Sequence, residues 1–107
     1  MSGAYVTEIK QPAVPSTPQI AVDGYWGTDT TKRLQQIFGT YQDGVISKSS
    51  NMVKAMQKRL GVTADGYLGK VTITALQRHY GTYQDGVISK PSNMVKAMQR
   101  TLNQNKF

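Results

Sequence analysis

The chain contains no cysteine, a single histidine and no glutamate beyond residue 22. Without cysteine, neither a disulfide framework nor a thiolate metal site can form. One histidine cannot supply the several ligands of a catalytic zinc site. Four of the five aspartates in residues 23–107 stand in Asp-Gly pairs typical of tight turns, which leaves too few carboxylates for the acid pair of a glycosidase. We therefore expect no catalytic residue, no metal site and no cofactor.

Long apolar runs are also missing. No segment approaches the roughly 20 residues of a membrane span, and the first 20 residues lack the charged start and apolar middle of a signal peptide. We expect a soluble chain that does not insert into membranes. At 107 residues it has room for one small domain, whose limited core makes a homo-oligomer possible.

What the sequence does contain is a repeat of 42 residues. The stretch GTYQDGVISK occurs at 39–48 and again at 81–90, and SNMVKAMQ follows each copy after one further residue. Residues 23–64 and 65–106 are identical at 26 of 42 positions. Repeats of this length usually form supersecondary units that bury their apolar faces against one another.

Each 42-residue repeat divides into two similar units. Asp-Gly pairs begin at Asp23, Asp43, Asp65 and Asp85. Glycine allows a positive φ in such a turn, and the aspartate can accept hydrogen bonds from backbone amides two residues on. A mostly apolar pair follows each turn, and these pairs are Tyr25-Trp26, Val45-Ile46, Tyr67-Leu68 and Val87-Ile88. We expect these pairs to dock into a core.

A helical pattern then completes each unit. Apolar residues four apart lie on one helix face, as in Leu34 with Phe38, Met56 with Leu60, Leu76 with Tyr80, and Met98 with Leu102. The expected N-caps are Thr28, Ser47 or Ser49, and Ser89, with Pro91 at a first helical position. The expected left-handed C-caps are Gly39, Gly61, Gly81 and Asn103. The sequence thus predicts an all-α fold, a small bundle of four short helices with pseudo-twofold internal symmetry.

Residues 1–21 differ in composition from the repeats. Prolines recur every third residue at 12, 15 and 18, which favours an extended, semi-rigid linker. We expect residues 1–21 to be a linker or the end of a preceding domain, and AYVTEIK to be a short strand. The helical domain is then 22–107, with repeat 1 at 23–64 and repeat 2 at 65–107. Such a chain would be the C-terminal piece of a longer protein, either an engineered fragment or a product of internal translation.

The units carry a resemblance to a known family. Residues 60–81, LGVTADGYLGKVTITALQRHYG, resemble the peptidoglycan-binding domain at the ends of bacterial and phage cell-wall hydrolases. The hallmark is Asp-Gly, two residues, Gly, two residues, Thr and an Ala-Leu-Gln helix, and residues 22–36 match it with Arg33 at the usual alanine. The two DGVIS segments depart from it, with Ser47 and Ser89 in place of the final glycine, and resemble the companion halves of endolysin tails. The resemblance implies a helical module that holds a lytic enzyme on the wall.

The charge of the chain bears on its partners. Thirteen Lys and Arg residues oppose six acids, for a net charge of +7. A basic surface favours polyanions without identifying them, so a Gram-positive wall with teichoic-acid-type polymers fits, and so does nucleic acid. Against nucleic acid, the sequence shows no recognised DNA-binding helical motif and no aromatic RNA-binding signature.

The aromatic residues indicate where a glycan would bind. Sugar rings stack their C–H faces on Tyr and Trp, while amides and carboxylates bond the hydroxyls. The candidate ligand-binding residues are Tyr25, Trp26, Tyr41, Gln42, Tyr67, Tyr83 and Gln84, all at turns. Tyr41-Gln42 and Tyr83-Gln84 are the better candidates, because Trp26 and Leu68 also read as equivalent core residues.

Together with these observations, the resemblance implies a noncatalytic cell-wall-binding module of an endolysin-type peptidoglycan hydrolase. Its ligand would be Gram-positive peptidoglycan or an associated glycopolymer, and its attached catalytic domain an amidase or muramidase. The place of action would be the bacterial cell wall, reached after release from the host cytoplasm. Two alternatives stay open, namely an oligomerisation module of such an enzyme and a basic nucleic-acid-binding repeat domain.

Overall fold

The structure, a computed structural model, describes residues 19–107. The predictions for residues 1–18, including the three prolines and the short strand, fall outside the described residues. Four α-helices of ten residues each make up the regular structure of the described part: α1 (Thr28–Ile37), α2 (Asn51–Leu60), α3 (Lys70–His79) and α4 (Asn93–Leu102). The predicted all-α fold with four short helices is confirmed.

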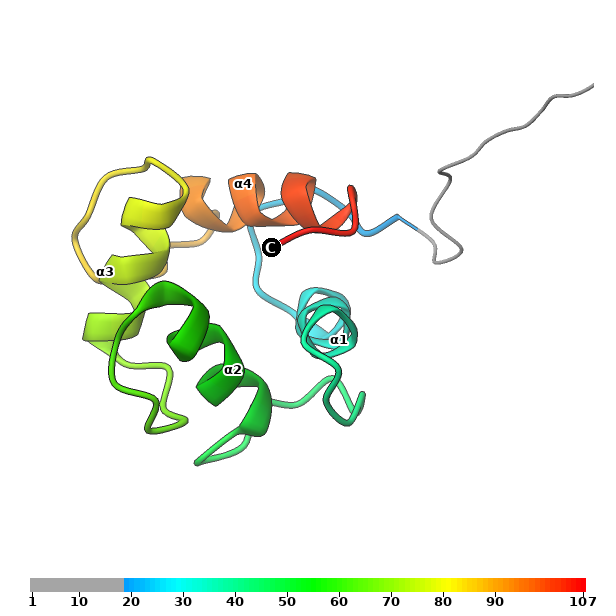
Figure 1. Cartoon of the computed structure of the whole chain (residues 1–107). Coiled ribbons are helices and arrows are strands. Elements are labelled where there is room, and N and C mark those ends of the chain that lie inside the picture. The colour runs from blue at the N-terminus through cyan, green and yellow to red at the C-terminus, as the bar shows by residue number, and fades with distance from the viewer. Residues whose placement is uncertain (1–18) are drawn as a thin grey trace, which may run out of the picture.

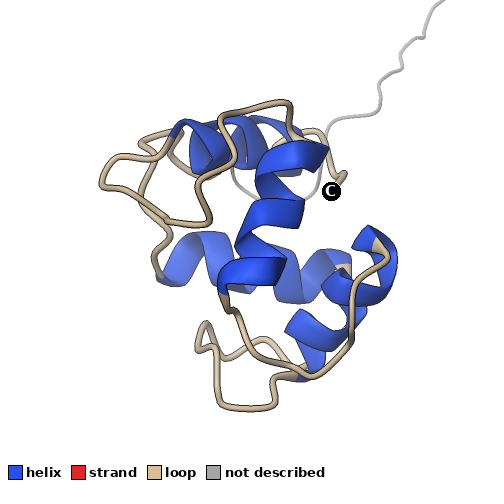
Figure 2. Ribbon diagram, turned by 90° about the vertical axis from the view of Figure 1, so that its left-hand side faces the viewer, coloured by secondary structure: helices blue, strands red, loops and turns tan. Residues whose placement is uncertain are grey.

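The four helices follow one another around a common centre, and α4 returns beside α1 (Figure 1). Contacts between helices join α2 to α3 and α1 to α4. Long loops connect the helices on the outside of this ring (Figure 2). None of the helices within 19–107 combines the length and apolar character needed to cross a bilayer.

The apolar residues spaced four apart in the helices form the core where the helices meet. The pairs after the Asp-Gly turns dock only in part: their second members pack against this core, whereas the first members, Tyr25, Val45, Tyr67 and Val87, are exposed. The buried set comprises Leu34, Met52, Val53, Met56, Leu76, Met94, Val95, Met98, Leu102 and Phe107. The outer members of the predicted pairs, Phe38, Leu60 and Tyr80, are partly buried and pack against this set. Phe107 stacks on His79 with 5.0 Å between ring centroids and meets Phe38 and Tyr80 edge-on. The chain's single histidine, His79, therefore packs against Phe107 at the edge of the core.

The helix boundaries correct several predicted caps. Gly27 and Gly69 precede α1 and α3 without a side-chain cap, so Thr28 is already helical. Ser50 and Ser92 cap α2 and α4 by accepting from Val53 N and Val95 N at 3.2 Å each. The predicted caps Ser47, Ser49 and Ser89 were wrong, because a capping oxygen must lie directly before the helix to reach its free amides. Pro91 likewise lies before the cap and not at the first helical position.

The helix ends agree with prediction at the three glycines. Gly39, Gly61 and Gly81 take φ values of 70°, 77° and 70°, the left-handed region. Asn103 does not, since its φ is −66°, and Asn105 with a φ of 61° is the left-handed residue instead. The last helix continues into a further turn, with Asn105 N donating to Leu102 O at 2.9 Å.

A buried glutamine clamps every Asp-Gly turn to a helix. In the second clamp, Gln57 Nε2 donates to Asp65 Oδ1 at 2.9 Å and to Tyr67 O at 3.0 Å, and Gly66 N donates to Gln57 Oε1 at 2.9 Å. The four clamps pair Gln35 with Asp43, Gln57 with Asp65, Gln77 with Asp85, and Gln99 with Asp23. The last pair joins α4 to the turn before α1, and this closes the ring.

Two residues of the expected linker also take part in the helical unit. Ile20 N donates to Asn103 Oδ1 at 2.8 Å, and Asn103 Nδ2 donates to Ile20 O at 3.0 Å. Gln19 Nε2 donates to Asn103 O at 3.0 Å, and the side chain of Ile20 packs against the core. These bonds hold the segment that leads into the first Asp-Gly turn against the end of α4.

Candidate functional site

Two equivalent pockets open at the duplicated loops GTYQDGVIS. The first, of about 170 Å³, is lined by Gln35, Thr40, Tyr41, Asp43, Val45, Ser47, Ser50, Asn51 and Met52. The second, of about 160 Å³, is lined by Gln77, Thr82, Tyr83, Asp85, Val87, Ser89, Ser92, Asn93 and Met94. Every lining residue has its counterpart 42 positions away, so the repeat builds the same small site twice.

The local structure explains why each pocket holds its shape. Thr40 N donates to Gln35 O at 2.9 Å, and Thr40 Oγ1 donates to the same carbonyl at 3.4 Å, which fixes the loop as it leaves α1. Asp43 Oδ1 then accepts from Val45 N at 3.0 Å and from Gln35 Nε2 at 2.8 Å. The loop is thus anchored on both sides of Tyr41. The second pocket repeats these bonds, with Thr82 N to Gln77 O at 2.8 Å.

The two loop tyrosines are the most exposed large hydrophobic side chains of the described residues. Tyr41 and Tyr83 are each 83% exposed, and the neighbouring Val45 and Val87 are 59% and 58% exposed. A tyrosine and a valine therefore flank each pocket with apolar surface, while Asp and Asn side chains supply polar groups between them. Exposed apolar groups beside polar ones match the amphipathic faces of a sugar ring.

The predicted site residues Gln42, Gln84 and Tyr67 lie outside the two loop pockets. Gln42 lines a separate cleft of about 390 Å³ with Asp29 and Lys32, although it adjoins Tyr41 in sequence. Gln84 is exposed and lies outside the two loop pockets. Tyr67 is 53% exposed and also lies outside them. The predicted pairing of each tyrosine with the following glutamine is therefore not how the pockets are built.

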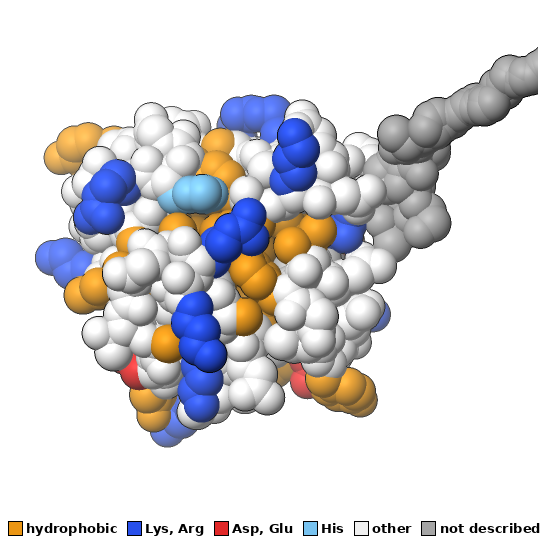
Figure 3. Space-filling view, in the orientation of Figure 1, with side chains coloured by type: hydrophobic (Ala, Val, Ile, Leu, Met, Phe, Trp, Pro, Cys, Tyr) orange, Lys and Arg blue, Asp and Glu red, His pale blue; other side chains and the backbone are white. Residues whose placement is uncertain are grey.

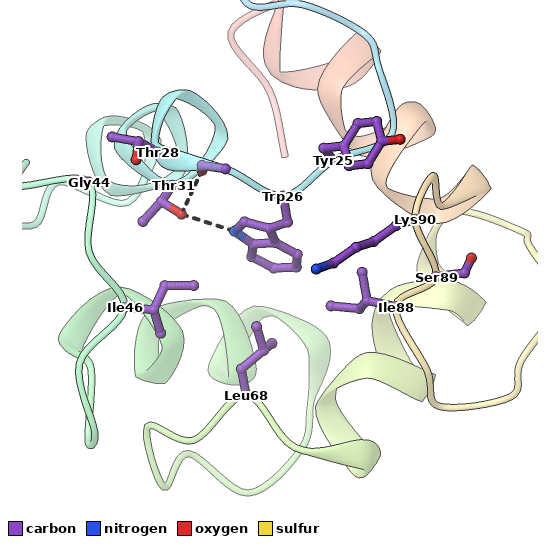
Figure 4. Close-up of a pocket in the computed structure, with 11 residues that line it drawn as sticks. Tyr25, Trp26, Thr28, Thr31, Gly44, Ile46, Leu68, Ile88, Ser89 and Lys90 are labelled. Atoms are coloured by element: carbon purple, nitrogen blue, oxygen red, sulfur yellow. Dashed lines mark hydrogen bonds between the residues drawn. The ribbon is translucent and has the colours of Figure 1, made fainter.

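Trp26 lies at a larger opening where the four units meet. We call this opening the central bowl, and define it by Trp26, Ile46, Leu68 and Ile88 with Tyr25, Thr28, Thr31, Ser89 and Lys90 around them. Its volume is about 710 Å³. The first four residues hold the same position in their units, and Figure 4 shows them converging from different segments of the chain. The indole N–H donates to Thr31 Oγ1 at 3.1 Å, so it is used within the fold.

Two groups of residues at these sites were not predicted from the sequence. The clamping glutamines Gln35, Gln57, Gln77 and Gln99 hold the loops in place. Their signal was available, since a glutamine precedes Asp43, Asp65 and Asp85 by eight residues in each case. Asn51 and Asn93 were also missed, because nothing in the sequence places these first residues of α2 and α4 in one pocket with a loop tyrosine.

The four turn carboxylates all have lowered pKa values. For Asp23, Asp43 and Asp65 the main cause is the backbone amide two residues on, followed by the clamping glutamine. For Asp85 the bond from Gln77 is the larger cause of the lowered pKa, and the Val87 amide follows. In every case a donor stabilises the charged form, which places these aspartates in a structural role. Within residues 19–107, no three acidic or histidine side chains cluster as a metal site would require.

These lowered pKa values predict a loss of stability in acid. A carboxylate whose pKa is lower in the folded state stabilises the fold above its ordinary pKa, and this contribution disappears as the pH falls through the folded value. We expect the urea midpoint to be constant near neutrality and to fall below about pH 4. Asp43→Asn, which retains an acceptor for Val45 N, should make this fall shallower. An unchanged midpoint at about pH 3 would contradict the clamp.

The surface carries basic side chains at the ends of several helices. Basic residues occupy the last turns of three helices, namely Lys58 and Arg59 in α2, Arg78 and His79 in α3, and Arg100 in α4. Figure 3 shows Lys and Arg side chains spread around a hydrophobic strip on one face, with the histidine at its edge and few acids in view. Arg59 lies over the Phe107 ring at 5.8 Å. This face suits an anionic polymer.

Comparisons with protein families, with curated proteins and with solved structures find no match for this chain.

Proposed function

We propose that this chain is a noncatalytic module that binds a glycan polymer of the Gram-positive cell wall and anchors an attached peptidoglycan hydrolase there. The observation that carries the proposal is the pair of equivalent loop pockets, each flanked by a tyrosine that is 83% exposed. A tyrosine needed only for folding would be buried, as Leu34 and Leu76 are. Two exposed tyrosines on anchored loops are instead suited to stacking on a ligand.

The chemistry of each pocket fits an amino sugar. The ring of Tyr41 can stack on the C–H face of a sugar, and Val45 extends the apolar surface. Asp43 uses its Oδ1 in the clamp, so its other carboxylate oxygen and the Asn51 amide are available in the pocket to bond hydroxyl and acetamido groups. Pockets of about 170 Å³ are small, so each would hold one sugar ring at modest affinity.

Duplication compensates for modest affinity at a single pocket. When one pocket is occupied, the next sugar of the polymer or a neighbouring strand is presented to the other at high effective concentration. Residence on a polymeric wall can then exceed that of either pocket alone by orders of magnitude. The basic surface adds attraction to teichoic-acid-type polymers, which weakens as salt rises.

The decisive experiment is co-sedimentation with purified Gram-positive sacculi. Tyr41→Ala combined with Tyr83→Ala should stay folded, because both side chains are exposed, and should lower the bound fraction at least about tenfold. Each single variant should lose less than the pair. Tyr67→Ala is the matched control, since Tyr67 is an exposed turn tyrosine outside both pockets and should bind normally.

Three outcomes would count against the proposal. The first is a folded double variant that sediments like the unchanged protein. The second is binding to intact sacculi that disappears when teichoic acid is extracted from them. The interaction would then depend only on the charge of teichoic acid. The third is retention on nucleic acid with a steep salt slope and no sedimentation with sacculi, which would favour a nucleic-acid partner.

A further inference from the structure

We propose that the central bowl is a third binding site, which shares only Ser89 with the second loop pocket, and that it takes an apolar acid. By this we mean a molecule with a ring-sized or short alkyl body and one carboxylate. The bowl is several times larger than either loop pocket, and its volume of about 710 Å³ lies within the usual range of small-molecule sites.

The floor of the bowl is apolar in all four units. Trp26, Ile46, Leu68 and Ile88 pack against the core on one side and line the bowl on the other, so each is only partly buried. A fold that needed these residues only as core would have closed over them, because leaving apolar surface in contact with water costs about 25 cal/mol per Å². Their partial exposure in one concavity therefore indicates an apolar occupant.

The concave shape argues against a second copy as that occupant. Two bowls placed face to face would enclose a void, and a void forfeits the close contacts that stabilise an interface. A small molecule, or the end of a chain, can fill the bowl without leaving such a gap. The site therefore selects a ligand narrower than a protein face.

The charge at the rim of the bowl indicates the charge of the ligand. Lys90 is the one charged residue among the described lining residues, and its side chain extends towards the bowl (Figure 4). No acidic residue lines the bowl in the described part of the chain. A single cation above an apolar floor is complementary to one anionic group on an apolar body. The Ser89 hydroxyl on the rim donates to Pro91 O at 3.0 Å and so is used within the fold.

The repeat supplies a matched control for Lys90. Lys48 occupies the same position in the same hexapeptide, DGVISK, but it is not among the residues that line the bowl. Lys90→Met keeps most of the aliphatic stem and removes the charge. Lys48→Met makes the identical change in the identical local sequence away from the bowl.

Trp26 provides the measurement, because it is the only tryptophan of the chain and forms part of the floor. We would titrate the protein with decanoate and with decanol, and with N-acetyl-leucyl-leucine and its amide, following tryptophan fluorescence and confirming each affinity by calorimetry. Both acids should bind about tenfold more tightly than their neutral partners. Lys90→Met should abolish this preference, and Lys48→Met should retain it.

The two pairs of probes distinguish the possible sources of such an acid. A stronger preference for decanoate points to a lipid-type acid, and one for the dipeptide points to the carboxyl end of a peptide. The proposal is overturned if calorimetry detects no binding of either acid, if acid and neutral partner bind equally, or if Lys48→Met acts like Lys90→Met. The variant that combines Tyr41→Ala with Tyr83→Ala should bind both acids normally. A negative result in the sacculus assay would therefore leave the proposal for the central bowl intact.

Discussion

Gln99→Leu is expected to destabilise the protein by about 3–5 kcal/mol, enough to leave it barely folded. Gln99 is 1% exposed, and its amide donates to Asp23 Oδ1, Tyr25 O and Thr30 Oγ1 at 3.0 Å each. Leucine has a similar size but offers none of these bonds. It would also leave the buried Gly24 N–H, which donates to Gln99 Oε1 at 2.9 Å, without its acceptor.

Urea unfolding followed by far-ultraviolet circular dichroism measures this loss. Gln104→Leu is the control, because Gln104 is exposed beyond α4 and should change stability by less than about 0.5 kcal/mol. Gln57→Leu removes the same kinds of bonds in the clamp that joins α2 to the turn at Asp65, and should cost a similar amount. A Gln99→Leu variant as stable as the unchanged protein would show that the closing clamp contributes nothing.

Much of this fold follows from local patterns in the sequence. The Asp-Gly pairs predict turns in which the aspartate accepts from the amide two residues on, and Asp65 Oδ1 does accept from Tyr67 N at 3.0 Å. The spacing of four between apolar residues predicts helices whose inner face holds Leu34 and Met98, both fully buried. These features depend on residues close together in the chain, so a pattern in the sequence is enough to find them.

The closing contact of the ring could not be found in this way. Gln99 and Asp23 lie 76 residues apart, and no local pattern joins them. The clamping glutamines also depart from the simple rule that a helix buries only apolar residues, because each is a polar side chain that is itself buried. Burial of each glutamine is favourable here because its side-chain amide donates to the turn aspartate and its carbonyl oxygen accepts from the turn glycine N–H.

The candidate sites differ in the same way: some are formed by residues close together in the sequence, and one is formed by residues far apart in it. The exposed loop tyrosines could be recognised from one repeat alone, because Tyr41 and Tyr83 fall in polar loops between helices. The central bowl could not, since its floor combines one residue from each of four units. Read singly, Ile46 or Leu68 is a core residue, and only the assembled ring shows that such residues also face a shared opening.

Gly66→Ala is expected to destabilise the protein by about 3 kcal/mol or more. Gly66 has a φ of 82°, where an L side chain is strained. An added Cβ would also lie 2.6 Å from Ser49 Cα and 2.7 Å from Ser49 C. Both are backbone atoms, so they cannot move aside as a side chain would. The turn would have to withdraw from the start of α2 and break the bond from Ser50 N to Gly66 O at 3.0 Å.

Gly61→Ala separates the two causes of this loss. Gly61 has nearly the same φ, 77°, but a Cβ added there would meet no atom within 4 Å. It should therefore cost only the strain of the left-handed conformation, about 1 kcal/mol. Urea unfolding of both variants gives the difference, which measures how closely the turn packs on α2. Equal losses at the two positions would mean that the turn can shift freely, and the Asp-Gly pair would then be required for its backbone conformation alone.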